Sequence, residues 1–460
     1  MLATVAGVSL TTAAVVGIGS DRPLAITAFF ATIGIVTAVV LAVTRFEMVT
    51  YLMIGCRTAI DLTHPGTDDG ALRFSVLITG AYAGISVLWL IIRRSDRPVR
   101  ITPLCIGVAG IAVAAVLSGL ISDERVKALT GASRWVFLTV LVLVLDNLIT
   151  EQRAARRLLV AIAASTFVPV LLGVWQLVGE RDRLVEGIFR IEGSFAHPNT
   201  YGFYLAVIGL ALFALIRSLP GALKPAARVW LFVVIVSLVY TFSRTSYAAF
   251  AVGVVAIAMA GRRWLLLGLT VISISIAPLI PAIGDRLADL GEGTTLRGTP
   301  GNSLTWRIDY WQTVIEAGEG RRVTGVGLGV VSEITESGRE PHNDFVRSFV
   351  ELGAIGLIAY VGFLLALGWQ ARNALARTRD RRSAEPPDMS QCLAEGFAGI
   401  FAAYLIESVT GNPMTQLIIL WYVIALAVAA LPTLPTRPTV GTESSGHRED
   451  LSLRSSRVHG

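Results

Sequence analysis

Long apolar stretches alternate with short polar ones along almost the whole chain. A helix that crosses a bilayer needs about 20 apolar residues, and on that template the sequence predicts about fourteen spans. They are residues 3–19, 24–43, 46–60, 74–92, 102–121, 131–148, 158–178, 200–217, 227–240, 245–260, 263–281, 348–368, 394–409 and 415–431. The third, ninth and tenth are short. We therefore expect an all-α polytopic membrane protein with about 12–14 transmembrane helices.

The composition supports this class. Hydrophobic residues make up 53% of the 460 and charged residues only 16%, and the mean hydropathy is +0.65. A soluble protein carries more charge, so the soluble classes are excluded. The first span lacks a basic flank and a small-residue cleavage site, and we interpret it as a retained helix. Residues 1–434 are expected to form the transmembrane domain, and residues 435–460 a disordered cytoplasmic tail.

Basic residues in the short connections predict the orientation. If every span crosses once, all the basic clusters from residue 93 onward lie on one side. The positive-inside rule assigns that side, and both termini with it, to the cytoplasm. The basic residues are Arg93, Arg94, Arg97, Arg100, Arg153, Arg156, Arg157, Arg217, Lys224, Arg228, Arg262, Arg263, Arg372, Arg377, Arg379, Arg381 and Arg382. The net charge of +6 therefore reflects orientation and does not indicate nucleic-acid binding. The three cysteines show neither disulfide-framework nor metal-ligand spacing.

One external segment is long enough to fold by itself, the loop at about 282–347 before the third-last span. Its residues 303–316 have the apolar spacing of an amphipathic helix with two tryptophans. Tryptophans favour the headgroup level, so this helix either lies on the outer membrane surface or packs on the bundle. The run Gly325-Val326-Gly327-Leu328-Gly329 is either a phosphate-cradling loop or a flexible turn. No strand precedes it, which weakens the first interpretation.

Polar side chains gather where the predicted external segments meet the membrane. The loop ends in Pro341-His342-Asn343-Asp344 followed by Arg347, and earlier segments supply Arg190, His197 and Asn199. Further candidates are Arg134, Ser243, Arg244, Glu407 and Asn412. Such residues are costly beside a bilayer unless they have a function. We expect these separated segments to meet at one membrane level.

Each candidate also has a structural interpretation. Arg190 can extend to lipid phosphates, as juxtamembrane arginines do, and His197 and Asn199 can cap the helix that follows them. His342 can be a buried histidine with satisfied hydrogen bonds. Asp344 and Glu351 can serve only to hold arginines in place, and Asn412-Pro413 can be a simple helix-start turn.

Four motifs in order resemble those of the O-antigen ligase and polymerase superfamily of bacterial membrane glycosyltransferases. The resemblance covers about residues 185–370. The matching pieces are the segment Gly193–Asn199, the pair Ser243-Arg244 opening a small-residue span, the glycine run 325–329, and Pro341–Phe345 with Glu351-Leu352-Gly353. The large loop lies between the second piece and the last.

The resemblance implies a glycosyltransferase C-like fold and a role in cell-envelope or exopolysaccharide biosynthesis. The donor is then a glycan on a polyprenyl pyrophosphate, presented at the outer face of the bacterial plasma (inner) membrane. The acceptor is a glycan, a lipid or a protein. The functional residues of the family correspond here to Arg190, Arg244 and His342.

The chemistry of these residues suits that reaction. Arginine forks bind phosphate oxygens bidentately, so Arg190 and Arg244 are assigned to the pyrophosphate. A neutral histidine can take the proton of the attacking hydroxyl, which is the role expected for His342. Asn343 or Asp344 is expected to orient its ring. The substrate-binding set is expected to comprise His197, Asn199, Ser243, Asn343, Asp344, Arg347 and Arg134.

No metal or other cofactor is expected, because the arginines neutralise the phosphates. The external segments hold no Asp-x-Asp pair, and Asp68-Asp69 is the nearest substitute. A single displacement would invert the anomeric centre. The competing class is a transporter or flippase for a lipid-linked or anionic substrate. Its polar residues would line a pathway at the bilayer midplane.

Overall fold

The computed structural model describes residues 40, 44–60, 74–94, 97–179, 183–185, 188–276, 304–379 and 387–431. The helices there are α3 (Phe46–Ile60), α4 (Phe74–Arg94), α5 (Pro103–Ile121), α6 (Arg125–Leu148), α7 (Gln152–Ser165), α8 (Phe167–Gly179), α9 (Pro198–Leu215), α10 (Lys224–Tyr240), α11 (Arg244–Ala260), α12 (Trp264–Ile276), α14 (Leu304–Ala317), α15 (Asp344–Arg377), α16 (Met389–Thr410) and α17 (Leu417–Ala429). A hairpin of β1 (Arg183–Val185) and β2 (Ile188–Arg190) precedes α9, and Arg183 pairs with Arg190. The predicted spans 3–19 and 24–43 (apart from residue 40), loop residues 282–303 and the tail 435–460 lie outside the described residues.

The all-α polytopic class is confirmed. Within the described ranges, seven helical segments are long and apolar enough to cross a membrane. They are Pro103–Ile121, Arg125–Leu148, Gln152–Gly179, Pro198–Ser218, Gly221–Tyr240, Asp344–Arg377 and Met389–Thr410. Helices α11 and α17 are apolar but shorter. The total of about 12–14 spans stays a prediction.

The predicted span 158–178 is broken into α7 and α8 at Thr166. Pro169 explains the break, because proline has no N–H to donate and its ring clashes with the carbonyl four residues earlier. The Thr166 hydroxyl donates to the Ala163 carbonyl and accepts from the Trp230 indole N–H at 3.0 Å. The polar groups at the break are thereby satisfied.

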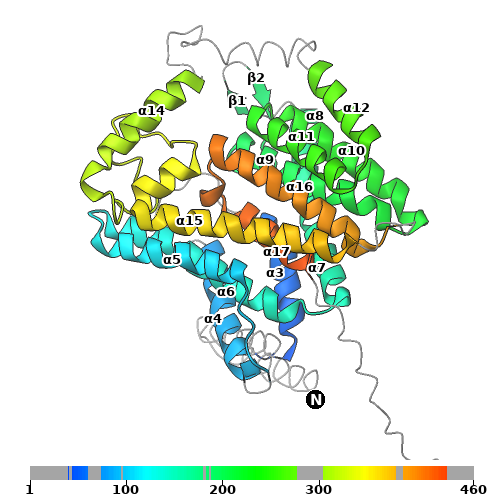
Figure 1. The fold of residues 1–460 in the computed structure, drawn as a ribbon, viewed down its shortest axis with the longest axis horizontal. Helices are drawn as coiled ribbons and strands as arrows, with labels where there is room; N and C mark the ends of the chain where they lie inside the picture. The colour runs from blue at the N-terminus through cyan, green and yellow to red at the C-terminus, as the bar shows by residue number, and fades with distance from the viewer. Residues whose placement is uncertain are drawn as a thin grey trace, which may run out of the picture.

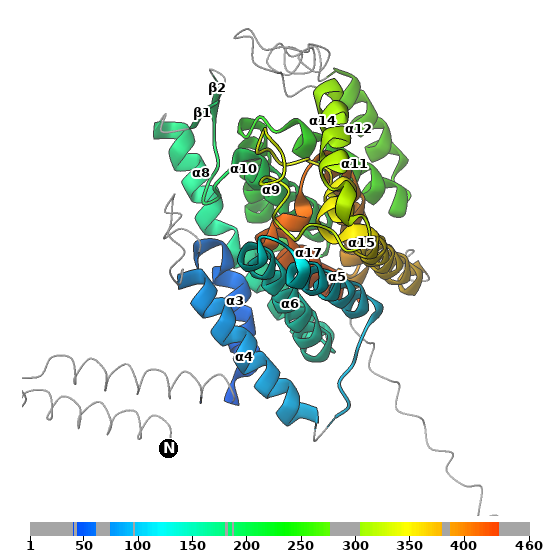
Figure 2. The same cartoon turned by 90° about the vertical axis from the view of Figure 1, so that its left-hand side faces the viewer.

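The bundle is built around α15, which lies between α5 and α16 (Figure 1). Helices α3 and α4 form one flank and α11 and α12 the other (Figure 2). Helices α9 and α17 are almost entirely buried in the main hydrophobic core. Small residues permit the closest approaches, since a Cβ at Gly399 of α16 would lie 2.7 Å from the Gly253 carbonyl oxygen of α11.

Helix α15 is interrupted at Gly353, which has φ 70° and ψ −168°. The interruption frees backbone groups, and the segment 322–327 pairs with them. Val326 and Gly327 donate to the carbonyls of Val350 and Glu351, and Ala354 donates to Arg322. A Cβ at Gly325 would lie 2.2 Å from the Glu351 carbonyl oxygen. The glycine run therefore lets the loop pack into the break in α15. N–H groups that a phosphate cradle would use already donate to backbone carbonyls.

Helix α14 packs on the bundle. Tyr310 and Val314 are buried in a second, smaller apolar cluster with Val326, Val330 and Val350. Of the two interpretations of residues 303–316, the structure favours packing. The amphipathic helix fixes the loop that leads to His342.

Ionisable side chains mark both ends of the bundle. At one end, which we call the site end, α10 and α16 finish and α9, α11, α15 and α17 begin. At the opposite end, Glu395 of α16 is 1% exposed and pairs with Arg217 and Arg263. Most of the basic clusters used to predict the orientation fall in connections at this opposite end.

Candidate active site

Arg190 ties together three segments of the site end. Its Nε donates to the Thr241 carbonyl at 2.8 Å and its Nη2 to Asn199 Oδ1 at 2.6 Å. The neighbouring Ile191 N–H donates to the Tyr240 carbonyl. The side chain is buried. Arg190 therefore holds the α10–α11 turn against the first turn of α9.

His197 and Ser243 stand at the starts of α9 and α11. His197 Nδ1 accepts from the Asn199 N–H at 3.1 Å, which is the capping contact considered as an alternative from the sequence. Its ring is exposed. The Ser243 hydroxyl lies 2.8 Å from that of Ser246, and both are buried where α9 meets the turn. These contacts fix the backbone that presents Arg244.

Arg244 is the first residue of α11 and is half-buried. Close to it lies Arg307 of α14, whose Nη1 donates to the Thr410 carbonyl at 2.8 Å. Burial and then the Arg244 charge lower the pKa of Arg307, and Glu407 raises it. Glu407 of α16 is 1% exposed and accepts a hydrogen bond from Thr245. Two guanidinium groups and one carboxylate thus meet between α11, α14 and α16.

His342 completes this cluster. Its backbone has φ 49°, a conformation unusual for a residue with a side chain. The neighbouring Pro341 carbonyl accepts from the Trp311 indole at 2.6 Å, and the Arg339 carbonyl accepts from the Tyr310 hydroxyl at 2.6 Å. Helix α14 therefore holds the part of the loop that comes just before His342. On the ring, Nδ1 lies 3.1 Å from the amide nitrogen of Asn412.

The pKa of His342 is lowered to about 4. Burial is the main cause, followed by the positive charges of Arg307, His197 and Arg339. The imidazole is therefore neutral at pH 7. These charges place His197 at the start of α9, Arg307 of α14 and Arg339 of the loop in the surroundings of the ring.

Other predicted residues lie in a buried network beside the cluster. Asn343 caps α15, its Oδ1 accepting from the N–H groups of residues 345 and 346. Asp344 accepts from the Tyr360 hydroxyl and from the Met414 N–H. Arg347 is fully buried and pairs with Glu351 at 3.1 Å and with Glu340. This network joins α15 to the loop and to the 3-10 turn η7 (Pro413–Thr415).

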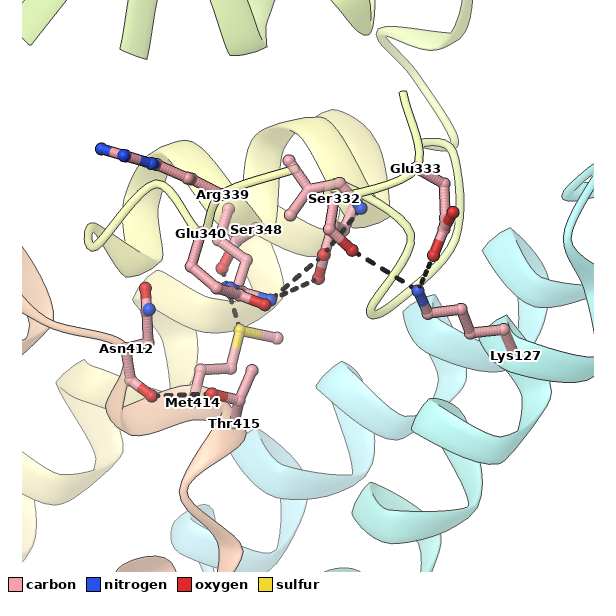
Figure 3. Close-up of polar contacts among 12 residues, drawn as sticks. Lys127, Ser332, Glu333, Arg339, Glu340, Ser348, Asn412, Met414 and Thr415 are labelled. Atoms are coloured by element: carbon pink, nitrogen blue, oxygen red, sulfur yellow. Dashed lines mark hydrogen bonds and ion pairs between the residues drawn. The ribbon is translucent and has the colours of Figure 1, made fainter. Parts of the chain in front are cut away.

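Arg134 of α6 lies on another side of η7. It is exposed and lines a cavity with Trp135, Gly329, Met414 and Thr415. Near this cavity, Lys127 of α6 contacts Ser332 and Glu333 and so holds the loop against α6 (Figure 3). Figure 3 also shows Asn412, Met414 and Thr415 of the η7 turn beside the part of the loop that carries Arg339 and Glu340.

Sequence reasoning missed Arg307 and did not give Asn412 a role at the site. Arg307 had a usable signal, since it lies four residues before Trp311 on the same helix face. Asn412 had none apart from its place in a predicted external turn. Among the described residues, His, Cys, Asp and Glu do not gather in groups of three that could hold a metal ion.

A comparison with protein families gives a match that begins near the middle of the chain. Residues 229–361 match the family model of the O-antigen ligase, a range that runs from α10 into α15 and includes Arg244, Arg307 and His342. No curated protein matches the chain. The motifs that suggested the resemblance from residue 243 onward fall inside the matched segment, whereas Arg190, His197 and Asn199 precede it. Over residues 229–361, the chain is therefore similar to the O-antigen ligase family.

Proposed function

We propose that this protein transfers a glycan from a polyprenyl-pyrophosphate carrier to an acceptor hydroxyl at the outer face of the bacterial inner membrane. The observation that carries the proposal is the meeting of Arg244, Arg307 and a neutral His342, three residues from different parts of the family-matched segment. A cationic cluster beside a neutral base suits a reaction in which a pyrophosphate leaves and a hydroxyl loses its proton.

The distribution of basic residues supports an outward-facing site. Arg217, Arg263 and, near the start of α10, Arg228 lie at the end of the bundle opposite His342. The positive-inside rule assigns short, basic connections to the cytoplasm. The site end then faces outward, where a lipid-linked donor is presented, and both termini are cytoplasmic.

In the proposed reaction the acceptor oxygen attacks the anomeric carbon and a new C–O bond forms. The bond from that carbon to the pyrophosphate oxygen breaks, and the electron pair leaves with the lipid pyrophosphate. His342 takes the hydroxyl proton, while Arg244 and Arg307 stabilise the charge that develops on the phosphates. Such a single displacement inverts the anomeric centre and needs no metal, because the guanidinium groups supply the positive charge.

Arg190 has a different share in this proposal. Two of its donors are engaged by Thr241 and Asn199, so its first task is to hold the turn from which Arg244 projects. Arg190 is also proposed to contact the pyrophosphate from the rim of the site. His197 and the buried network of Asp344 and Arg347 are proposed to keep the donor glycan and the loop in register.

The test uses protein reconstituted in proteoliposomes with a lipid-pyrophosphate glycan and an acceptor, and products are analysed by mass. His342→Ala, Arg244→Ala and Arg307→Ala are each expected to lower transfer at least about 10²-fold. Arg228→Ala is the matched control, because Arg228 is an exposed arginine near the start of α10, at the opposite end. Near wild-type transfer by His342→Ala or Arg244→Ala would remove the catalytic assignment.

The same products distinguish the two activities of the superfamily. A ladder of repeat units indicates a polymerase, and one block moved to a different acceptor indicates a ligase. Uptake or flipping of the lipid-linked donor without a new glycosidic bond would instead support the transporter alternative.

A further inference from the structure

The side chain of Asn412 approaches the ring of His342 from its Nδ1 side. Asn412 lies in the turn after α16, and its amide nitrogen is 3.1 Å from Nδ1. The Asn412 side chain is buried, and its Oδ1 has no hydrogen-bond partner among the described residues. The amide nitrogen therefore contacts the ring, whereas the amide oxygen has no hydrogen-bond partner among the described residues.

The turn that carries Asn412 is rigidly placed. The Thr415 hydroxyl donates to the Asn412 carbonyl at 3.0 Å, and the Met414 N–H donates to Asp344 Oδ2 at 2.8 Å. Asp344 is itself two residues from His342 in sequence and accepts a hydrogen bond from the Tyr360 hydroxyl. Asn412 and His342 are thus presented to each other by one connected piece of structure.

The hydrogen bond at Nδ1 decides what Nε2 can do. In a neutral imidazole one nitrogen carries the proton and the other accepts, and a partner at one nitrogen fixes the tautomer. When the Asn412 Nδ2 faces the ring, Nδ1 accepts and Nε2 carries the proton, so Nε2 cannot act as a base. When the carboxamide is turned through 180°, Oδ1 accepts from Nδ1–H and Nε2 offers its lone pair.

We propose that Asn412 is a positioning residue that sets the tautomer of His342, its amide oxygen holding the proton on Nδ1 so that Nε2 accepts the proton of the attacking hydroxyl. The inference rests on the proposed function, since it assigns a partner to the base of that reaction. Asn412 itself does not touch the reacting atoms.

The charged groups around the ring come from several elements. Arg307 of α14, His197 at the start of α9 and Arg339 of the loop all disfavour protonation of His342. Arg244 and Glu407 lie beyond Arg307 and act on it with opposite sign. Asn412 is neutral, so it selects a tautomer without adding charge, and an aspartate in its place would add a negative charge beside the ring.

Two variants test the role of Asn412. Asn412→Asp has a side chain of the same shape that can only accept from Nδ1–H, and it favours the protonated ring. It is expected to retain transfer, with the acid limb of the rate profile moved to higher pH. Asn412→Leu cannot accept and is expected to lower kcat about 10-fold to 10²-fold with little change in KM for the lipid donor.

Thr415→Val is the control. It removes a hydrogen bond from the same turn but leaves the ring contact intact, and it is expected to keep the wild-type pH profile. Ring ¹⁵N shifts of ¹⁵N-histidine protein, assigned by comparison with His342→Gln, report the tautomer independently of turnover. Asn412→Asp is expected to show Nδ1 protonated.

The outcomes separate the two proposals. Wild-type kcat and pH profile in both Asn412 variants, alongside an inactive His342→Ala, would overturn the role of Asn412 and leave the proposed function standing. Efficient transfer by His342→Ala would overturn the proposed function itself.

Discussion

At the residue scale, the site brings several positive charges close together. Arg244 and Arg307 repel each other, and Glu407 is the carboxylate that acts on Arg307 against this repulsion. Arg347 adds little to this positive charge, because it already pairs with Glu351 and Glu340. Like charges held together in a partly buried place favour the arrival of an anion. A pyrophosphate is the kind of ligand that this balance of charge would bind.

The pKa of His342 leads to a prediction at this scale. With a pKa of about 4 the imidazole is unprotonated at neutral pH, so transfer is expected to be level from pH 8 to about pH 5 and to fall as the pH approaches 4. Arg339→Gln removes one of the positive charges that lower this pKa. The acid limb of kcat is then expected to move to higher pH, by less than about one pH unit because Arg339 is exposed and screened by salt.

The measurement is the pH–rate profile of both proteins at low and at physiological salt. Arg322→Gln, another exposed arginine of the same loop whose charge pairs with Glu319, is the control and is expected to leave the profile unchanged. A limb that moves to lower pH in Arg339→Gln would contradict the electrostatic account.

How far the site could be predicted depended on the residue. Arg244 and His342 stood out because a charge or an imidazole beside an apolar span needs a reason. Arg307 was overlooked because the amphipathic pattern of residues 303–316 was interpreted from its apolar positions alone. Asn412 was hidden because an Asn-Pro pair already has an explanation as a helix start. Contacts across 70 residues, such as that from Asn412 to His342, are set by packing and leave no local pattern.

At the element scale, the broken helix α15 carries the site. Its first turns, from Asp344 to Leu352, are capped by Asn343 and contain the buried Arg347–Glu351 pair, and the remainder crosses the bundle. The break at Gly353 lets the loop 322–327 hydrogen-bond to groups that a continuous helix would use internally. The position of His342 therefore depends on the seam between the loop segment 322–327 and the break in α15.

Substitution of Gly353, in the break of α15, gives the second prediction. Gly353→Ala is expected to lower stability by at least about 2 kcal/mol, because φ 70° with ψ −168° is a region open essentially to glycine only. The added Cβ would also lie 2.1 Å from the Val323 carbonyl oxygen. Transfer is expected to fall with it, as the loop shifts and carries His342 away from Arg307.

Gly362→Ala in the same helix is the matched control. A Cβ there meets nothing within 4 Å, and alanine favours the helix over glycine by about 0.5–1 kcal/mol. Thermal unfolding in detergent and transfer rate are measured for both. Equal unfolding midpoints for the two variants would show that the break does not need glycine.

Most helices within the described ranges followed from the sequence, whereas the β1–β2 hairpin and two helix breaks did not. Spans such as 102–121 and 200–217 agree closely with α5 and α9 because their apolar runs are long and their ends are marked by Pro103 and Pro198. The breaks at Thr166 and Gly353 were not predicted. Both lie inside apolar runs, where hydropathy stays high while the backbone changes direction.

At the scale of the whole molecule, the two ends of the bundle carry different chemistry. The site end gathers the cluster around His342, and the opposite end gathers basic residues around one buried carboxylate. Figure 1 shows how the long helices α5, α15 and α16 connect the two ends. The arginines that predict the orientation and those proposed to act in catalysis thus lie at opposite ends of the bundle.

This separation predicts that stability and activity can be changed independently. Glu395 is almost fully buried and holds Arg217 of the turn after α9 and Arg263 of the α11–α12 turn. Glu395→Gln leaves both guanidinium groups without their carboxylate and is expected to cost about 3 kcal/mol of unfolding free energy. Glu47→Gln is the control, since its pair with Arg157 is well exposed and is worth at most about 1 kcal/mol. Because the damage lies at the end opposite His342, the folded fraction of Glu395→Gln should transfer glycan at the wild-type rate. Thermal unfolding together with transfer per folded molecule measures both quantities. A proportional loss of specific activity would mean that the opposite end is coupled to the site through α16, and the two ends could then no longer be treated as separate.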